Sequence, residues 1–390
     1  MSYLLSIVVP TKDRYGHLKH LINLVVGFDS NEIELVIQDN TFHNDEILKF
    51  LSTKKCAHLR YYHSREQLPI SENVDVAIKN SIGEYVCFIG DDDGVLPNII
   101  DCVKWMKKND IDALRPAITI YNWPDFFYSR INNISGELCY DNFSFVAEEI
   151  EIKESLQNLA NRGFTHIYTI PKVYQGIVKH KCLDEIYKMG GTFSPGPSPD
   201  MATAVALSFV VKKFVAINLP VILVGQSQNV GGGERKLKGK VRNIDEVPFL
   251  PKDAKQNWDS RIPKVWCSQT VWPESAIKAI EYMNKESEID IDYEYILAKF
   301  IHTHYSNKKL ALKLSRNNTR LFYYLIFLKI SGAFLAIHWR IKYLVTKKIK
   351  FEGRNNINRG INNIEEASYF FMREYPSYSS AEAFDSLSIS

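Results

Sequence analysis

The chain has 390 residues, of which 45% are hydrophobic and 24% charged, and its formal net charge is +3. These values are typical of a globular protein with one large core or two to three smaller ones. They exclude a disordered or collagen-like chain, and no zinc-finger spacing or RNA-binding signature supports a nucleic-acid binder. The six cysteines are scattered without a Cys-x-x-Cys pair, which favours buried thiols in a reduced, cytoplasmic protein.

The first 120 residues alternate strand and helix signals. Apolar runs predict strands at 4–10, 33–40, 58–64, 84–90 and 112–121, and helical spacing predicts helices at 14–28, 45–51, 71–83 and 98–109. The first run follows no basic start and therefore reads as a strand rather than a signal peptide. Ser71 is the expected cap of the third helix. This alternation predicts a doubly wound, mostly parallel α/β sheet, in which ligands bind at the carboxyl ends of strands.

From residue 122 the pattern loosens into an aromatic, irregular stretch that reads as an insertion or binding loop. Further signals predict helices at 152–163, 174–189 and 201–211 and strands at 164–170 and 214–225. The polar, glycine-rich segment 226–240 is neither a Walker loop nor a dinucleotide fingerprint, because no strand–GxGxxG–helix unit surrounds it.

The part from about residue 265 is predicted to be mainly helical, with helices at 273–285 and 293–305 and a long segment from 310 to 350. Residues 321–337 are apolar apart from Lys329 and small polar breaks, slightly short of the ~20 residues that a spanning helix needs. The basic residues around them have only Glu352 as a nearby acid: Lys308, Lys309, Lys313, Arg316, Arg320, Arg340, Lys342, Lys347, Lys348 and Lys350. The pattern fits a helix on an anionic membrane surface, a buried helix of a helical subdomain, or an oligomer contact. The Ser-rich tail after Tyr375 is expected to be loose.

Three consecutive carboxylates, Asp91, Asp92 and Asp93, follow the apolar run of "EYVCFIGDDDGVLP". Hard divalent cations such as Mg²⁺ or Mn²⁺ prefer oxygen ligands, usually one or two carboxylates with water and substrate phosphates. In a tight turn Asp91 and Asp93 can point the same way. The alternative is a solvated turn built on the Asp93-Gly94 pair.

The segments "SIVVPTKDR", "IELVIQDN", "ISENVDVAIKNSIGEYVCFIGDDD" and "SPGPSPD" occur in an order that resembles family 2 glycosyltransferases of the GT-A fold. More narrowly, they look like bacterial members that build surface polysaccharides. The resemblance covers roughly residues 3 to 230, is best in the first hundred, and does not reach the C-terminal third.

The resemblance implies a role for the residues after the first two strands. Pro10, Thr11, Asp13 and Arg14 would line the base and ribose pocket, and Asp39 would contact the base. Asn73 is a weaker candidate for the nucleotide or phosphate wall. Arg14 could instead be a surface residue at a helix start, and Asp39 a turn former.

The resemblance also implies that the aspartates bind Mg²⁺ or Mn²⁺ bridging a sugar-nucleotide diphosphate. Asp93 would be the direct ligand, and Asp91 would contact ribose or metal-bound water. Asp92 could hydrogen-bond the ribose or be solvated. A cation there would neutralise charge on the leaving group.

Asp200 in "SPGPSPDMATAVAL" matches the position of the family's general base, which takes the proton of the attacking acceptor hydroxyl. The chain has Pro199-Asp200 where the family more usually has a Glu-Asp pair, and a helix cap is the alternative. His166 and Tyr174, with Gln175, could border the acceptor pocket, although a strand-borne histidine is more often packed. Segment 226–240 could be a mobile lid that brings Arg235 or Lys236 near phosphates, or a flexible linker.

The sequence therefore predicts a nucleotide-sugar-binding half at 1–120, an acceptor-binding half at 121–230, a lid or linker at 231–264, and a helical, membrane-associating region at 265–390. The predicted function is an inverting, metal-dependent hexosyltransferase. It would use a UDP-sugar to extend bacterial capsule or lipopolysaccharide O-antigen, on a saccharide or lipid-linked acceptor at the inner face of the plasma membrane. One alternative is a sugar nucleotidyltransferase, but "PTKDRYG" lacks its Gly-rich basic loop. The other is a catalytically silent GT-A-like scaffold, against which the acids at all three sites argue.

Overall fold

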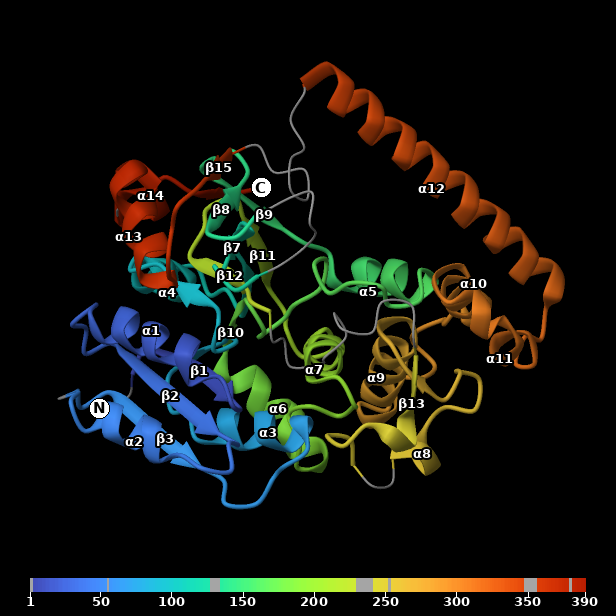
Figure 1. Ribbon diagram of the computed structural model, residues 1–390, viewed down its shortest axis with the longest axis horizontal. Coiled ribbons are helices and arrows are strands. Elements are labelled where there is room, and N and C mark those ends of the chain that lie inside the picture. The colour runs from blue at the N-terminus through green and yellow to red at the C-terminus, as the bar shows by residue number, and fades with distance from the viewer. Residues whose placement is uncertain are drawn as a thin grey trace.

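The computed structural model describes residues 3–54, 56–126, 134–228, 241–251, 254–346, 356–378 and 381–390. Its centre is a nine-stranded sheet of order β16-β9-β11-β6-β10-β4-β1-β2-β3 beside a five-stranded sheet of order β15-β8-β7-β12-β5 (Figure 1). The strands are β1 Leu5–Thr11, β2 Ile33–Asp39, β3 Leu59–His63, β4 Tyr85–Phe88, β5 Gly94–Val95, β6 Ala113–Arg115, β7 Thr119–Asn122, β8 Glu137–Tyr140, β9 Val146–Glu149, β10 Ile177–Lys179, β11 Phe214–Ile217, β12 Ile222–Gln226, β13 Arg242–Asn243, β14 Val265–Trp266, β15 Asn356–Asn358 and β16 Ser388–Ile389.

Helices cover both faces of the larger sheet. They are α1 Tyr15–Val26, α2 Asp45–Leu51, α3 Ile70–Lys79, α4 Ile99–Lys108, α5 Ile152–Asn161, α6 His180–Gly190, α7 Pro199–Leu207, α8 Ala254–Asn257, α9 Ser268–Tyr282, α10 Tyr293–Thr303, α11 Lys308–Leu312, α12 Asn318–Thr346, α13 Ile364–Glu374 and α14 Ala381–Asp385. Two buried clusters, one on each face, make the main core.

The first strands form as the sequence predicts. β1, β2 and β4 are near-continuous apolar runs because both faces of the sheet are covered. β1 pairs in parallel with β2 and β4, which puts Thr11 opposite Asp39 and Val8 opposite Phe88. The strand ends therefore meet at one edge, and the doubly wound prediction is confirmed.

Two of the predicted strands are each split between the two sheets. Segment 112–121 becomes β6 in the larger sheet and β7 in the smaller one, and segment 214–225 becomes β11 and β12 in the same way. Pro116, which cannot donate to a ladder, lies where the first segment leaves the larger sheet. β7 and β12 then pair in parallel, so the smaller sheet reaches the strand ends of the larger one.

Three local predictions are wrong. Segment 164–170 forms turns, beginning at Phe164 with φ of +52°, rather than a strand. The predicted helix 174–189 starts as β10, antiparallel to β4 and β6, and turns helical only at His180. Ser71 lies inside α3, whose N-cap position is Pro69. For β10, pairing with β4 and β6 overrides the helical spacing of its residues.

The C-terminal part is helical from α9 to α12 and then returns to the sheets. β15 pairs with β8 and β16 with β9, while α13 lies against α1 (Figure 1, red beside blue). The tail expected to be loose is ordered where the structure describes it, since Ala383, Phe384 and Leu387 are buried in the core. Within 231–264, β13 pairs with β14 and Trp258 is buried, while Arg235 and Lys236 lie outside the described residues.

Candidate active site

A cavity of about 320 Å³ opens at the strand ends of the larger sheet. Its lining brings together residues from six separate parts of the sequence, at the ends of β1 and β4, on α3, before β10, at the start of α7 and in β12. Eight of the residues singled out from the sequence line it: Pro10, Thr11, Arg14, Asn73, Asp91, Asp92, Tyr174 and Asp200. The rule that ligands bind at the carboxyl ends of strands therefore locates this cavity.

Arg14 joins two of the aspartates. Its Nη1 lies 2.9 Å from Asp91 Oδ1 and its Nη2 lies 2.7 Å from Asp92 Oδ2. Thr11 donates to the second oxygen of Asp91 at 2.7 Å, and Ser227 donates to Asp92 at 2.7 Å. Burial raises the pKa of Asp91 to about 7, and the guanidinium opposes that shift. The arginine thus supplies the positive charge that the buried pair requires.

Asp93 lies behind the cavity wall and is 1% exposed. Its oxygens accept from the amide of Gly90 at 2.8 Å, the amide of Gly225 at 2.7 Å and the Gln175 side chain at 3.2 Å from each oxygen. Burial, aided by the charge of Asp92, raises the pKa of Asp93 to about 7. The carboxyl group is therefore fixed in orientation by donors from three different segments.

Asp39 and Asp13 do not line the cavity. Asp39 is fully buried and accepts from the hydroxyls of Tyr15 and Tyr61 at 2.6 and 2.7 Å and from the amide of Thr41 at 2.8 Å. Asp13 is exposed, with a left-handed φ of +57°, and its amide donates to Thr41 Oγ1 at 2.9 Å. In this arrangement Asp39 braces the turn that carries Asp13.

Asp200 is the second residue of α7 and lines the side of the cavity formed by that helix. The N-cap position is Ser198, so Asp200 is not the cap itself. Burial raises the pKa of Asp200 to about 6, and the charge of Lys172 opposes that shift. A carboxyl group with a pKa near neutrality is suited to accept a proton from a hydroxyl.

Lys172 was not singled out from the sequence. It is 3% exposed, and burial lowers its pKa to about 8, while the charges of Asp200 and Asp93 raise it. No ion pair of its ammonium group occurs within the described part of the chain. Nothing local in "TIPKVYQG" marks this lysine, since its burial arises from packing between distant segments.

Other site residues lie at the carboxyl end of β12. Gly225 lines the cavity, and Ser227 accepts from Arg14 at 2.6 Å. Both stand in "LVGQSQ", at the carboxyl end of a predicted strand, so the strand-end rule could have found them.

His166 lies outside the cavity and stacks beside Tyr168, and burial lowers its pKa. Asn73 is 6% exposed, and its Oδ1 has no partner among the described residues.

The aspartates fit a divalent cation in donor chemistry. Among the residues that the structure describes, no three His, Cys, Asp or Glu side chains converge on one point. Mg²⁺ and Mn²⁺ nevertheless often take only one or two carboxylates, and substrate phosphates complete the shell. Asp91 faces the cavity. The side-chain amide of Gln175 is shared between the two oxygens of Asp93, so its hydrogen bond to each is weak.

Comparisons with known proteins were made for the sequence and for the fold. The model of the Glycosyl transferase family 2 matches residues 6–170. No curated protein matches the chain. Among solved structures, S. aureus TarS 1-349 in complex with UDP-GlcNAc is 13% identical, with a TM-score of 0.48, covering 82% of this chain and 79% of that one. The UDP complex of TarS 1-349 is 14% identical at a TM-score of 0.44, covering 83% and 87%. The longer TarS structure is 14% identical, with a TM-score of 0.43. The match covers 78% of this chain and only 44% of the TarS chain.

Proposed function

We propose that this chain, whose residues 6–170 match the model of the Glycosyl transferase family 2, moves a sugar from a nucleotide-diphosphate sugar to a hydroxyl of a saccharide acceptor, with inversion. The GT-A fold class predicted from the sequence is confirmed. One observation carries the proposal. A single cavity holds both the strand-end residues Arg14, Asp91 and Asp92 and the helix-start acid Asp200.

The proposed reaction is a single displacement at the anomeric carbon. The acceptor oxygen forms the new bond to that carbon, and the bond from the carbon to the diphosphate oxygen breaks. The nucleoside diphosphate leaves with the bonding electron pair, and the acceptor proton passes to Asp200. One displacement inverts the configuration. Asp200 suits this role because burial holds its pKa at about 6, so it is mostly ionised at neutral pH.

Asp93 and Asp91 are the proposed ligands of Mn²⁺ or Mg²⁺. When bound, the cation would neutralise negative charge on the diphosphate as it leaves. Arg14 and Thr11 hold Asp91, while Gly90 and Gly225 hold Asp93. The chain's own contribution is thus to fix both carboxylates before a donor arrives.

The donor is proposed to be a UDP-sugar. The nucleotide would lie against Pro10, Thr11 and Arg14, and the unpartnered Oδ1 of Asn73 would accept a hydrogen bond from it. Asp39 and Asp13 would contribute by shaping the turn after β1, because their described contacts are internal. Asp92 would hold Arg14 and Ser227 in place.

Isothermal titration tests the donor site. Wild-type protein should bind UDP in the presence of Mn²⁺, and Asp93→Ala should lose the metal-dependent part of that binding. GDP and dTDP serve as comparison nucleotides. Metal-dependent binding that survives Asp93→Ala would remove the metal assignment.

A second measurement separates the base from the donor site. Asp200→Asn should bind UDP as the wild type does but release far less UDP from a UDP-sugar in the presence of acceptor. Full transfer by Asp200→Asn would remove Asp200 from the mechanism.

The proposed cellular role is surface-polysaccharide synthesis at the inner face of a bacterial membrane, and α12 is the proposed contact. Within α12, Asn318–His338 has the length and composition of a membrane span, with a mean hydropathy of 1.7. Leu321 and Leu328 are buried, but most of its other apolar side chains are exposed, among them Phe322 at 64% and Phe334 at 70%. The helix runs as a separate arm along one side of the protein (Figure 1).

The charge of this region favours an anionic lipid surface. Residues 295–351 contain twelve of the 48 basic residues and none of the 45 acidic ones. A second copy of the same helix would bring like charges together, whereas anionic headgroups attract each Lys or Arg by about 1 kcal/mol. We therefore propose anionic phospholipid as the occupant of this face.

The fold favours a helix that lies on the membrane over one that crosses it. Residues before α12 and residues after it both belong to the same body, since β15 pairs with β8 and α13 lies against α1. If α12 crossed, residues 347–355 would have to recross ~30 Å of hydrocarbon. They include Lys347, Lys348 and Lys350, whose charges are costly inside a bilayer.

A further inference from the structure

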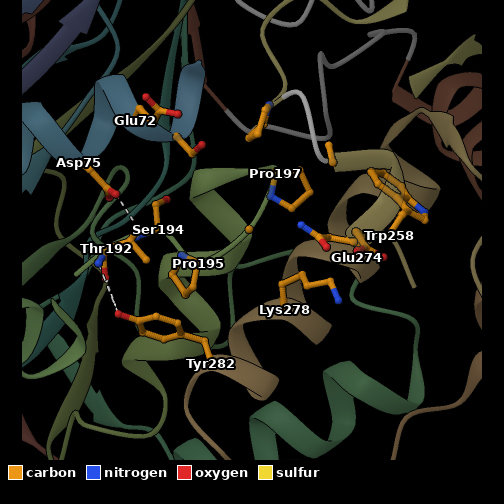
Figure 2. A pocket seen from close by; sticks show the side chains of 15 residues that line it. Glu72, Asp75, Thr192, Ser194, Pro195, Pro197, Trp258, Glu274, Lys278 and Tyr282 are labelled. Carbon is orange, nitrogen blue, oxygen red and sulfur yellow. Dashed lines mark hydrogen bonds between the residues drawn. The ribbon is translucent and has the colours of Figure 1, made fainter. Parts of the chain in front are cut away.

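A second cavity, of about 520 Å³, lies next to the candidate active site and is the larger of the two (Figure 2). Four segments build its walls: the first turns of α3, the stretch from Thr192 to Pro197, helix α9, and the residues Pro251, Ala254, Asn257 and Trp258 that precede α9. α9 and Trp258 lie beyond residues 6–170, the part that matches the family. The cavity therefore joins the matched region, through α3, to segments beyond it.

The two cavities share their dividing walls. On α3, Asn73 and Val74 line the active-site cavity, whereas Glu72 and Asp75 line the second one. The stretch that ends at Pro197 borders the second cavity, and three residues later Asp200 lines the first. A molecule bound in the second cavity would consequently lie close to the proposed base.

The walls of the second cavity are fixed by hydrogen bonds. Asp75 accepts from the hydroxyl of Thr192 and, at 3.0 Å, from the amide of Phe193. Ser275 on α9 accepts from the amide of Ser198 at 2.8 Å. Gly196 lies so near α9 that an added Cβ would stand 2.9 Å from Ser275 Cα. The cavity is thus largely formed before any ligand binds, as small-molecule sites usually are.

The lining combines carboxylates with aromatic rings. Glu72, Asp75 and Glu274 line the cavity together with Lys278, whose ammonium group donates to Glu281 at 2.8 Å, and Trp258 and Tyr282 add aromatic rings (Figure 2). The indole Nε1 of Trp258 is buried without a partner among the described residues.

The lining of the second cavity selects ligands by their charge. Carboxylates accept hydrogen bonds from hydroxyl and ammonium groups, and aromatic faces contact the apolar faces of pyranose rings. A phosphate or carboxylate placed here would meet Glu72, Asp75 and Glu274 and a lysine already paired with Glu281, and like charges at close quarters suppress binding. The lining therefore suits a polyhydroxylated ligand that carries no negative charge.

We propose that this cavity binds a neutral or amino sugar residue of the acceptor, one without phosphate or carboxylate groups. The proposal rests on the transferase function proposed above and assigns acceptor selection to α3 and α9. The sugar held here positions the neighbouring acceptor hydroxyl toward Asp200. Acceptors with an anionic residue at this position are excluded.

The experiment measures binding of three matched trisaccharides by tryptophan fluorescence: triacetylchitotriose (neutral), chitotriose (amino) and trigalacturonate (anionic). The neutral or amino trisaccharide should bind, and the anionic one should bind at least about tenfold more weakly, or 1.4 kcal/mol. Ser71→Trp fills the cavity from α3 and should abolish saccharide binding while leaving UDP binding unchanged. Ser71 makes no side-chain hydrogen bond in the described structure, so this change does not break a fold contact.

Charge is tested by Glu72→Gln, with Glu154→Gln as a matched control. Both glutamates lie in the first turn of a helix, α3 and α5 respectively, but only Glu72 lines the cavity. Glu72→Gln should narrow the difference in binding affinity between the neutral and anionic trisaccharides, and Glu154→Gln should leave that difference unchanged. The proposal is overturned if no trisaccharide binds at millimolar concentration, if binding survives Ser71→Trp, or if trigalacturonate binds most tightly. Failure of the wild-type protein to bind UDP would instead refute the proposed transferase function.

Discussion

The amide of Gly225 on β12 donates to Asp93 Oδ1 at 2.7 Å, and no side chain can be added to Gly225 without collision. A Cβ at that position would lie 1.7 Å from the carbonyl oxygen of Asp92. Strand β12 of the smaller sheet therefore packs directly against the turn that contains Asp92 and Asp93, which follows β4 of the larger sheet. The geometry of the turn depends on a residue 132 positions away in the chain.

Gly225→Ala should displace the aspartate turn and abolish Mn²⁺-dependent UDP binding, because the new methyl group cannot fit beside Asp92. Calorimetry measures the binding and thermal unfolding measures the stability, which should also fall. Gly16→Ala is the matched control, since nothing lies within 4 Å of a Cβ at Gly16. That helix position should gain about 0.5–1 kcal/mol. Normal UDP binding by Gly225→Ala would contradict the proposed coupling.

Arg14→Gln should lower the free energy of unfolding by about 3 kcal/mol, because it leaves two buried carboxylates without their counter-charge. Mn²⁺ should then stabilise the variant more than it stabilises the wild type, since the cation supplies the missing charge. Urea unfolding with and without Mn²⁺ measures both effects. Arg60→Gln is the control, because Arg60 pairs with the fully buried Glu34 far from the cavity. An equal response of Arg14→Gln and Arg60→Gln to Mn²⁺ would argue against a cation at Asp91.

The rate of sugar transfer should fall at acid pH. Asp200 has its pKa raised to about 6, and a base acts only when ionised. Above pH 7 the rate should be level, and below about pH 6 kcat/KM should fall tenfold per pH unit. A pH–rate profile with a fixed UDP-sugar concentration measures this. A profile still level at pH 5 would show that Asp200 is not the proton acceptor.

Lys172→Met should move the acidic limb of the pH–rate profile to higher pH. The ammonium group opposes the upward shift of the pKa of Asp200, so its removal raises that pKa. Lys172→Arg keeps the positive charge and should return the limb toward the wild-type position. A profile that Lys172→Met leaves unchanged would limit Lys172 to a structural role.

Replacing Phe322, Phe327 and Phe334 by serine should release the protein from sedimented vesicles that contain phosphatidylserine. All three side chains are exposed on α12, so the folded body should keep its melting temperature. Binding by the wild type should weaken with added salt and be absent from vesicles of phosphatidylcholine alone. Serine at Phe42 and Phe145, which are exposed outside α12, should leave sedimentation unchanged. Equal sedimentation by both variants would refute the membrane contact.

The fold of the first 110 residues could be predicted from the sequence because local signals and tertiary structure agree there. Segment 45–51 was predicted as a helix and forms α2 with those bounds. Strand-end reasoning placed Thr11 and Asp91 together, since parallel strands bring their carboxyl ends to one edge, whereas Asp200 was assigned through the family resemblance. Hydrophobic periodicity carries information only about residues that are close in the sequence, and in this region such local patterns determine the secondary structure.

The remaining features depend on contacts between distant segments. Pro116 marks a break in its apolar run, but nothing near Pro116 or Asn218 shows that the chain continues in a second sheet, and nothing near Lys172 indicates that it is buried. The predicted strand at 164–170 failed because an apolar run has the same pattern in a buried turn as in a strand. The packing of α9 against residues 196–198 joins elements some 75 residues apart, which a pattern of local period cannot report.

The pairing of β15 with β8 and of β16 with β9 also has a consequence for biosynthesis. The ribosome must release residues 356–389 before either sheet acquires its outermost strand. Until then β8 and β9 present open edges, which are the surfaces through which nascent chains aggregate. A polypeptide terminated within α12 would therefore be left with both edges unpaired and would be a natural substrate for chaperones and proteases. Only a chain translated past this point can close its sheets.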